Sequence, residues 1–266
     1  EYIMYATNSA KASDVSDAVA KLATADDGKL LAGGQTLLPT LKQRLASPDQ
    51  LIDLAGCGLS SISTSNDTIK IGAMTCHADV AKHKDVAAAN PGLASLAGGI
   101  GDRQVRNCGT IGGSVANNDP AACYPSALLA LRGTIHTNKR DISADEFFVG
   151  MFETALDDDE VITAITLPNP QKSAYVKFPN PASRYAMVGV FVAKFADGVR
   201  VAVTGAGEDG VFRASDIEAA LSAKFDAASL DGMTLSEDGL MEDIHASPAY
   251  RAHLIVEMAR RAVTAC

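Results

Sequence analysis

One glycine-rich stretch decides the fold of this chain: CGTIGGSVANNDP, residues 108–120. Glycine has no Cβ, so backbone N–H groups can come close to an anion, and consecutive N–H groups in such turns form a concave anion site. Another glycine turn lies earlier in the chain, AGGQT at residues 32–36, and has the same character; we call it the first glycine turn and residues 108–120 the second glycine stretch. Two such turns suit the two phosphoryl groups of a pyrophosphate, although two tight structural turns would use the same residues. We therefore expect the chain to close around a phosphate-bearing ligand.

The residues after this stretch predict a helix that faces it. Asp119 and Pro120 have the form of an N-cap followed by proline at the first helical position, and the apolar run that follows predicts a helix over residues 121–131. The N-terminus of this helix would point at the glycine stretch, where its dipole and free N–H groups would add to the anion site.

Composition excludes several classes of protein. With 266 residues, 47% of them hydrophobic and 21% charged, the chain is typical of a globular protein with two domains of about 100–150 residues. Its net charge of −9 and its lack of a basic tract argue against nucleic-acid binding. Apolar runs such as residues 126–131 fall far short of the roughly 20 residues that cross a bilayer, and residues 1–12 do not resemble a signal peptide.

The cysteines predict a reducing environment. They are odd in number and form no C-x-x-C pair, so we expect a cytoplasmic protein that binds no metal or iron–sulfur cluster by itself. The five are Cys57, Cys76, Cys108, Cys123 and Cys266.

Residues 1–55 predict a small α/β subdomain. Ser13 is the expected N-cap of a helix with an apolar stripe from Val15 to Leu22. A short buried strand over residues 29–32 runs into the first glycine turn. A helix over residues 39–44 and a strand over residues 50–54 follow, and a boundary is expected near residue 55.

Residues 56–168 predict a second α/β subdomain. Residues 68–73 alternate like a half-buried strand, and Thr75 is the expected N-cap of a helix that starts at Cys76. His77 is then expected to be an exposed residue at the helix start, because no partner has metal-ligand spacing. Another helix is expected from Pro91, and a strand over residues 161–167.

Residues 169–266 predict an α+β domain after the linker candidate Pro-Asn-Pro at residues 168–170. We expect a three-stranded sheet and two helices. The strands are expected over residues 187–195, 199–204 and 211–213, and the helices over 216–225 and 248–263. In the last helix Tyr250, Leu254 and Met258 share one face, which we expect to pack on the sheet, the alternative being a groove for a partner.

One motif in this domain is misleading. GAGEDG, residues 205–210, spells the G-x-G-x-x-G fingerprint of a Rossmann fold. That fingerprint requires a helix to start within the motif, whereas residues 211–213 resemble a returning strand and two acidic residues stand where a pyrophosphate would lie. We expect a hairpin turn. The chain also lacks the G-x-x-x-x-G-K-[ST] motif of P-loop nucleotidases.

The motifs together resemble the FAD-binding medium subunit of molybdenum hydroxylases, and in particular the medium-subunit family of aerobic carbon monoxide dehydrogenases. The resemblance covers nearly the whole chain and rests on AGGQTLLP (32–39), RNCGTIGGS (106–114), NNDP (117–120) and DEVI (159–162). It implies an α+β chain with a vanillyl-alcohol-oxidase or PCMH-type FAD fold. That fold has two α/β subdomains, residues 1–55 and 56–168, and a C-terminal domain, residues 169–266.

The resemblance also implies which residues contact FAD. The first turn and the second turn would surround the pyrophosphate, Ile100 would lie near the flavin, and Tyr185 would place its ring against the isoalloxazine or else serve as a core residue. Cys123 stands where many relatives have an aspartate, which puts that polar contact in doubt. The implied contacts are Leu30, Leu31, Ala32, Gly33, Gly34, Gln35, Thr36, Leu37, Ile100, Thr110, Ile111, Gly112, Gly113, Ser114, Asn117, Asp119, Cys123, Ile162, Lys177 and Tyr185.

In this family a molybdenum subunit oxidises the substrate, an iron–sulfur subunit with two [2Fe-2S] clusters relays electrons, and the FAD subunit passes them to an external acceptor. The resemblance implies this last role for the chain, in a dimer of heterotrimers whose molybdenum cofactor and clusters belong to the partners. No catalytic acid, base or nucleophile is expected here. Two other classes stay open: a self-contained flavin oxidase or dehydrogenase, which would need a larger second domain, and a flavin-free scaffold subunit, which Cys123 favours.

Overall fold

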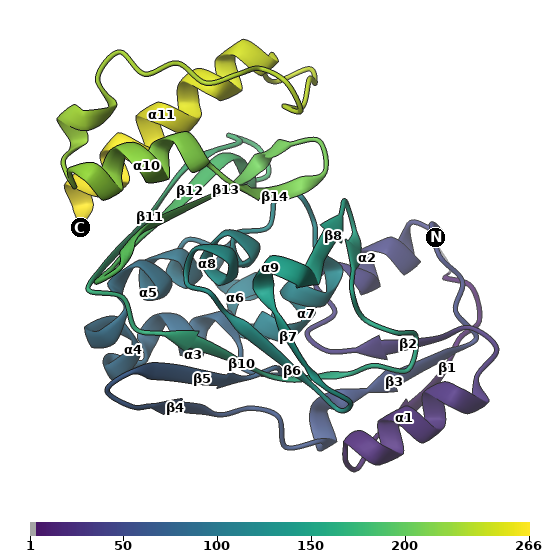
Figure 1. Ribbon diagram of the computed structural model, residues 1–266. Helices are drawn as coiled ribbons and strands as arrows, with labels where there is room; N and C mark the ends of the chain where they lie inside the picture. The colour runs from purple at the N-terminus through teal and green to yellow at the C-terminus, as the bar shows by residue number, and fades with distance from the viewer. Residues whose placement is uncertain (1–3) are drawn as a thin grey trace.

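The structure is a computed structural model that describes residues 4–266. Figure 1 shows a small N-terminal sheet beside a larger central sheet, and a third sheet stacked over the helices that cover the central one. The first sheet is parallel, with β3 (Gln50–Asp53) between β1 (Asn8–Lys11) and β2 (Gly28–Leu31). Helices α1 (Val15–Thr24) and α2 (Leu37–Lys42) lie between these strands in the chain. This strand–helix alternation matches the α/β subdomain predicted from the sequence.

The central sheet is antiparallel and has the order β4-β5-β10-β6-β7. Ile69, Ile71, Ile165 and Leu167 are fully buried in it beneath the helices. The strands are β4 (Ile62–Thr64), β5 (Thr68–Gly72), β6 (Thr134–Thr137), β7 (Asp141–Ser143) and β10 (Ile162–Pro168). The helices are α3 (His77–Lys82), α4 (Lys84–Ala89), α5 (Pro91–Gly98), α6 (Arg103–Cys108), α7 (Ile111–Asn117), α8 (Tyr124–Ala130) and α9 (Ala144–Phe147), with a small hairpin of β8 (Phe148–Gly150) and β9 (Glu153–Thr154).

The third sheet has four strands where three were expected. The missed strand is β11 (Lys172–Pro179), which pairs with β12 (Ala186–Phe195) along its whole length. The other two strands are β13 (Gly198–Gly207) and β14 (Gly210–Arg213). Prolines flank the segment of β11, and its inward and outward residues do not alternate strictly, so the sequence concealed it.

Helices cover both faces of the third sheet. Figure 1 shows α10 (Ser215–Ala223) and α11 (Pro248–Ala265) on its outer face and α8 on its inner face. All seven residues of α8 are buried, as expected for a helix enclosed between two sheets. In α11, Leu254 and Met258 pack in the core as predicted, but Tyr250 remains 42% exposed at the sheet edge beside the Phe178 ring.

The misleading GAGEDG motif is a hairpin turn, as predicted. Gly207 at the end of β13 pairs with Gly210 at the start of β14, and no helix begins there. None of its residues lines the cavity described below.

Three predicted helix starts are wrong. Asp14, not Ser13, caps α1, because its carboxylate accepts the Asp17 N–H at 2.8 Å. Thr75 does not cap α3, since its hydroxyl exchanges hydrogen bonds with the backbone of Ser61. The helix expected over residues 121–131 begins only at Tyr124, because Asp119 closes a turn with the Ala121 N–H instead. Separately, no helix within residues 4–266 has the length and apolar character needed to cross a bilayer.

Candidate functional site

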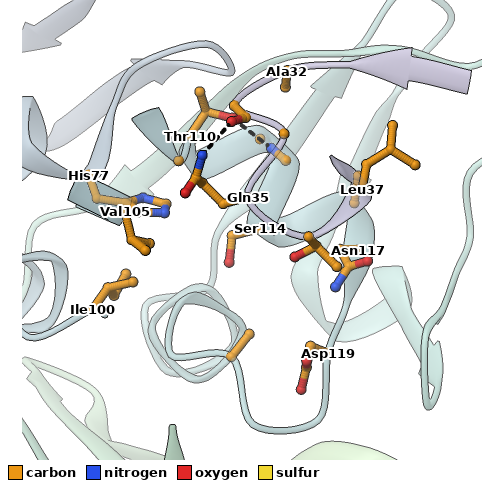
Figure 2. Close-up of a pocket in the computed structure, with 18 of the residues that line it drawn as sticks. Ala32, Gln35, Leu37, His77, Ile100, Val105, Thr110, Ser114, Asn117 and Asp119 are labelled. Atoms are coloured by element: carbon orange, nitrogen blue, oxygen red, sulfur yellow. Dashed lines mark hydrogen bonds between the residues drawn. The ribbon is translucent and has the colours of Figure 1, made fainter. Parts of the chain in front are cut away.

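A cavity of about 750 Å³ lies where the three sheets meet. Its walls come from the first glycine turn, the glycine stretch of residues 108–120, and the loop between β11 and β12. Figure 2 shows side chains from the first two regions, among them Gln35, Thr110 and Asn117, together at the wall of this cavity. A volume of this size falls in the range of about 300–1,000 Å³ that is usual for cofactor sites.

The cavity brings together most of the residues that the resemblance implies. All twenty line it except two: Leu31, which lies within β2, and Ile111, which is fully buried in the core. The residues that line it are Leu30, Ala32, Gly33, Gly34, Gln35, Thr36, Leu37, Ile100, Thr110, Gly112, Gly113, Ser114, Asn117, Asp119, Cys123, Ile162, Lys177 and Tyr185.

The first glycine turn leaves its backbone N–H groups free. Within residues 4–266, no N–H of residues 33–37 donates a hydrogen bond to the protein. Gly34 has a φ of 67°, in the left-handed region that favours glycine, and this conformation turns the chain from β2 into α2. Concave anion sites use consecutive free N–H groups of this kind, and binding of an anion at residues 33–37 stays a prediction.

The second glycine stretch uses its N–H groups differently. It starts α7, a helix that the sequence did not predict, with the Thr110 hydroxyl as N-cap. Four N–H groups that were expected to face a ligand donate within the protein: Ile111 to the Thr75 carbonyl (3.1 Å), Gly112 to the Ala73 carbonyl (2.9 Å), Gly113 to the Thr110 hydroxyl (3.2 Å) and Ser114 to the Thr110 carbonyl (3.1 Å).

Glycine in this region permits close contact between backbones. A Cβ on Gly33 would stand 2.2 Å from the Cys108 carbonyl oxygen, so the two glycine regions touch directly. A Cβ on Gly112 would stand 2.6 Å from the Ala73 Cβ, just after β5. The second stretch therefore offers the cavity side chains rather than N–H groups, above all the Ser114 hydroxyl and the Asn117 amide.

His77 was expected to be exposed, and this is wrong. Its side chain is only 4% exposed, lines the cavity and lies against the Tyr124 ring, with 5.3 Å between ring centroids. Burial, helped by the nearby Arg106 guanidinium, lowers the pKa of His77 to about 4, so the imidazole is neutral at pH 7. Within the described residues, no three His, Cys, Asp or Glu side chains are grouped to hold a metal ion.

The third sheet closes one end of the cavity through Lys177. Its ammonium donates to the carbonyls of Gly99 (2.8 Å) and Arg184 (3.0 Å) and lies 3.7 Å from the Cys123 sulfur. Tyr185, at the end of the loop between β11 and β12, is 48% exposed at the cavity wall, so it is not a core tyrosine. Partial burial, with the neighbouring Asp119 and Cys123, raises the pKa of the Tyr185 phenol, which stays protonated at neutral pH.

Sequence reasoning missed several lining residues. Met74, His77 and Val105 were not predicted, and neither were Ala182–Arg184 of the β11–β12 loop. Met74 and His77 reach the cavity because Cys76 forms a β-bridge with Thr110, a pairing across 34 positions. No local pattern in the sequence indicates such a pairing.

Comparison with known proteins identifies a family whose match includes both glycine regions. The profile of one protein family, described as "FAD binding domain in molybdopterin dehydrogenase", matches residues 5–170. The nicotine 6-hydroxylase medium subunit of Paenarthrobacter nicotinovorans is 36% identical, covering 96% of this chain and 95% of that one. The carbon monoxide dehydrogenase medium chain of Hydrogenophaga pseudoflava is 32% identical, covering 94% and 93%. A solved structure of carbon monoxide dehydrogenase from Hydrogenophaga pseudoflava, which lacks the Mo-pyranopterin moiety, superposes with a TM-score of 0.88 at 32% identity, covering 99% of this chain and 98% of that one.

Proposed function

The chain belongs to the family of FAD binding domains in molybdopterin dehydrogenases, and we propose that it is the FAD-binding medium subunit of a molybdenum hydroxylase complex. The observation that carries this proposal is the row of five free N–H groups at residues 33–37, which opens on a cavity of about 750 Å³. A pyrophosphate needs several donors around two phosphoryl groups, and this turn supplies them without breaking any bond of the fold.

The residues present fit FAD along the whole cavity. The N–H groups of 33–37 would hold the pyrophosphate, and the hydroxyl of Ser114 and the amide of Asn117 offer further polar contacts. Ile100, Ile162 and Tyr185 give the apolar and aromatic walls that a flavin ring requires. A bound FAD would supply the redox chemistry, while the protein would set its position and surroundings.

We propose that electrons reach this subunit from a partner. In this assignment an iron–sulfur subunit passes electrons from its [2Fe-2S] clusters, FAD on this chain carries them to an external acceptor, and a molybdenum subunit oxidises the substrate. The match to FAD binding domains in molybdopterin dehydrogenases and to a carbon monoxide dehydrogenase medium chain supports assigning the metals to other subunits. Two such heterotrimers would pair. The relatives are named for chemically different substrates, so carbon monoxide, an aldehyde and an N-heterocycle are all candidate substrates of the complex.

The domain division proposed for the chain is residues 1–55, 56–168 and 169–266. Its support is that each range holds one of the three large sheets. The first range holds β1 to β3, the second holds β4, β5, β6, β7 and β10 together with the small β8–β9 hairpin, and the third holds β11 to β14. The five cysteines are all free, which suits the cytoplasm that we propose as the location.

Affinity purification from the native host tests this function. We expect flavin absorbance on this chain and recovery of two partner subunits, with iron and molybdenum found by metal analysis. Recovery of a lone, catalytically competent flavoprotein without iron or molybdenum would identify a self-contained flavin enzyme instead. A complex with both metals but no flavin on this chain would identify a scaffold subunit.

A further inference from the structure

One buried side chain in the cavity has no hydrogen-bond partner. The Nδ1 atom of His77 is closed off from solvent and unpaired, and within residues 4–266 Nε2 makes no hydrogen bond either. Buried polar atoms are nearly always paired, because an unpaired one loses its bonds to water and gains nothing in return. Nδ1 stays enclosed by protein whatever binds, whereas His77 lines the cavity and its Nε2 has no partner within residues 4–266, so Nε2 is the atom that a ligand in the cavity would complete.

The surroundings hold the imidazole in one place and keep it neutral. The ring lies against Tyr124, and the nearby Arg106 guanidinium is itself fixed by the carbonyls of Ile100 (2.9 Å) and Gly101 (3.0 Å). A neutral imidazole has one N–H donor and one acceptor. With Nδ1 enclosed by protein, Nε2 is the nitrogen that can reach a ligand.

Close contacts place Nε2 beside the first glycine turn. A Cβ on Gly109 would stand 2.7 Å from Nε2 of His77, so the imidazole rests on the Gly109 backbone. A Cβ on Gly33 would stand 2.7 Å from the Gly109 Cα. The imidazole, Gly109 and Gly33 therefore lie in direct succession, and Gly33 is the first of the five residues with free N–H groups. Figure 2 shows the ring of His77 directed into the same cavity as the Gln35 side chain.

We propose that His77 is a binding residue for the pyrophosphate of the cofactor, with its Nε2–H donating to a phosphoryl oxygen beside the N–H groups of 33–37. The positive charge of Arg106 near the ring favours an anion at this point. Because the Nε2–H donates to a charged oxygen, this hydrogen bond contributes more to the affinity for the cofactor than a bond between neutral groups would. This inference rests on the proposed function, since it presumes that FAD is the ligand.

Three ligands and two main variants test the assignment in the full chain after removal of flavin. FAD has both a pyrophosphate and a flavin, ADP has a diphosphate without a flavin, and riboflavin has a flavin without phosphate. His77→Phe keeps the ring that packs on Tyr124 but removes the donor, and His77→Gln keeps an N–H near the position of Nε2. We expect His77→Phe to weaken FAD and ADP by about 10- to 100-fold and riboflavin not at all, and His77→Gln to stay within about threefold of wild type.

A matched control uses the other histidine with an enclosed, unpaired Nδ1. His83 does not line the cavity, so His83→Phe should leave all three affinities unchanged. If His77→Phe does not fold, His77→Met serves as the apolar counterpart of His77→Gln.

Each outcome decides a different point. Wild-type affinity for FAD in His77→Phe would overturn the inference, as would a loss that affects riboflavin but not ADP. An equal loss in His77→Gln and His77→Phe would show that the ring only packs, and would overturn it too. A wild-type chain that binds no FAD would instead defeat the proposed function.

Discussion

The two glycine regions touch each other but use their backbones in opposite ways. In the first turn, residues 33–37, no N–H donates within residues 4–266, whereas the N–H groups of residues 111–114 all do. The first turn is therefore open toward the cavity, and the second is closed against the end of β5. A glycine-rich sequence thus indicates that something approaches the backbone closely. Whether that is a ligand or another part of the chain depends on the neighbours that folding supplies.

The largest expected effect comes from a bulky residue in the second region. Gly112→Val would place its Cβ 2.6 Å from the Ala73 Cβ and 2.7 Å from the Ala73 carbonyl oxygen, and this backbone cannot move aside cheaply. We expect a loss of more than about 3 kcal/mol in the free energy of unfolding of the flavin-free chain, measured by thermal unfolding. Gln35→Val, in the exposed first turn, should stay within about 0.5 kcal/mol. A Gly112→Val chain that folds normally but lacks FAD would show that the second region, too, is open toward the ligand.

Acid should loosen the second region through His77. Its pKa is about 4 in the folded chain against an ordinary 6.5, so between these values the unfolded chain binds more protons than the folded one. The stabilising contribution is complete above pH 6.5 and is lost as the pH falls through 4, a change of about 3 kcal/mol. Urea unfolding of the flavin-free chain at several pH values measures it. His77→Phe should flatten this part of the profile, and parallel profiles would show that the imidazole titrates normally.

Removal of single N–H groups separates the two regions directly. An ester bond in place of the amide at Thr36, introduced with the corresponding hydroxy acid, removes an N–H that bonds nothing in the protein. We expect FAD to bind about tenfold more weakly with stability unchanged. The same change at Gly112 removes its hydrogen bond to Ala73 and should cost about 1 kcal/mol of stability with FAD affinity unchanged. If the ester changed FAD affinity and stability equally at Thr36 and Gly112, the two regions would not differ in how they use their N–H groups.

The smallest effect concerns the helix cap in the second region. Thr110→Val removes the hydroxyl that accepts the Gly113 N–H and should lower the free energy of unfolding by about 1 kcal/mol in urea, whereas Thr110→Ser should retain it. Ser114→Ala removes a hydroxyl that faces the cavity and should leave stability unchanged. Equal losses from Thr110→Val and Ser114→Ala would mean that the cap contributes nothing specific.

The sequence by itself determined the local elements and their order. Periodicity located α1, α5, α11 and the β12–β13 hairpin to within a few residues, because the spacing of apolar side chains reflects which side of an element is buried. The two glycine regions and their chain order also identified the family. The resemblance then implied twenty contact residues, of which all but Leu31 and Ile111 line the cavity.

Only the tertiary structure decided which polar groups are free. The N–H of Gly112 is bound because Ala73, 39 positions earlier, lies opposite it, and His77 is buried because Cys76 pairs with Thr110. Strand β11 likewise became recognisable only beside β12. Local patterns record backbone preference and burial, but a hydrogen-bond partner from a distant segment exists only once the chain has folded. The sequence therefore predicted where backbones come close, and the fold determined which of them remain open to a ligand.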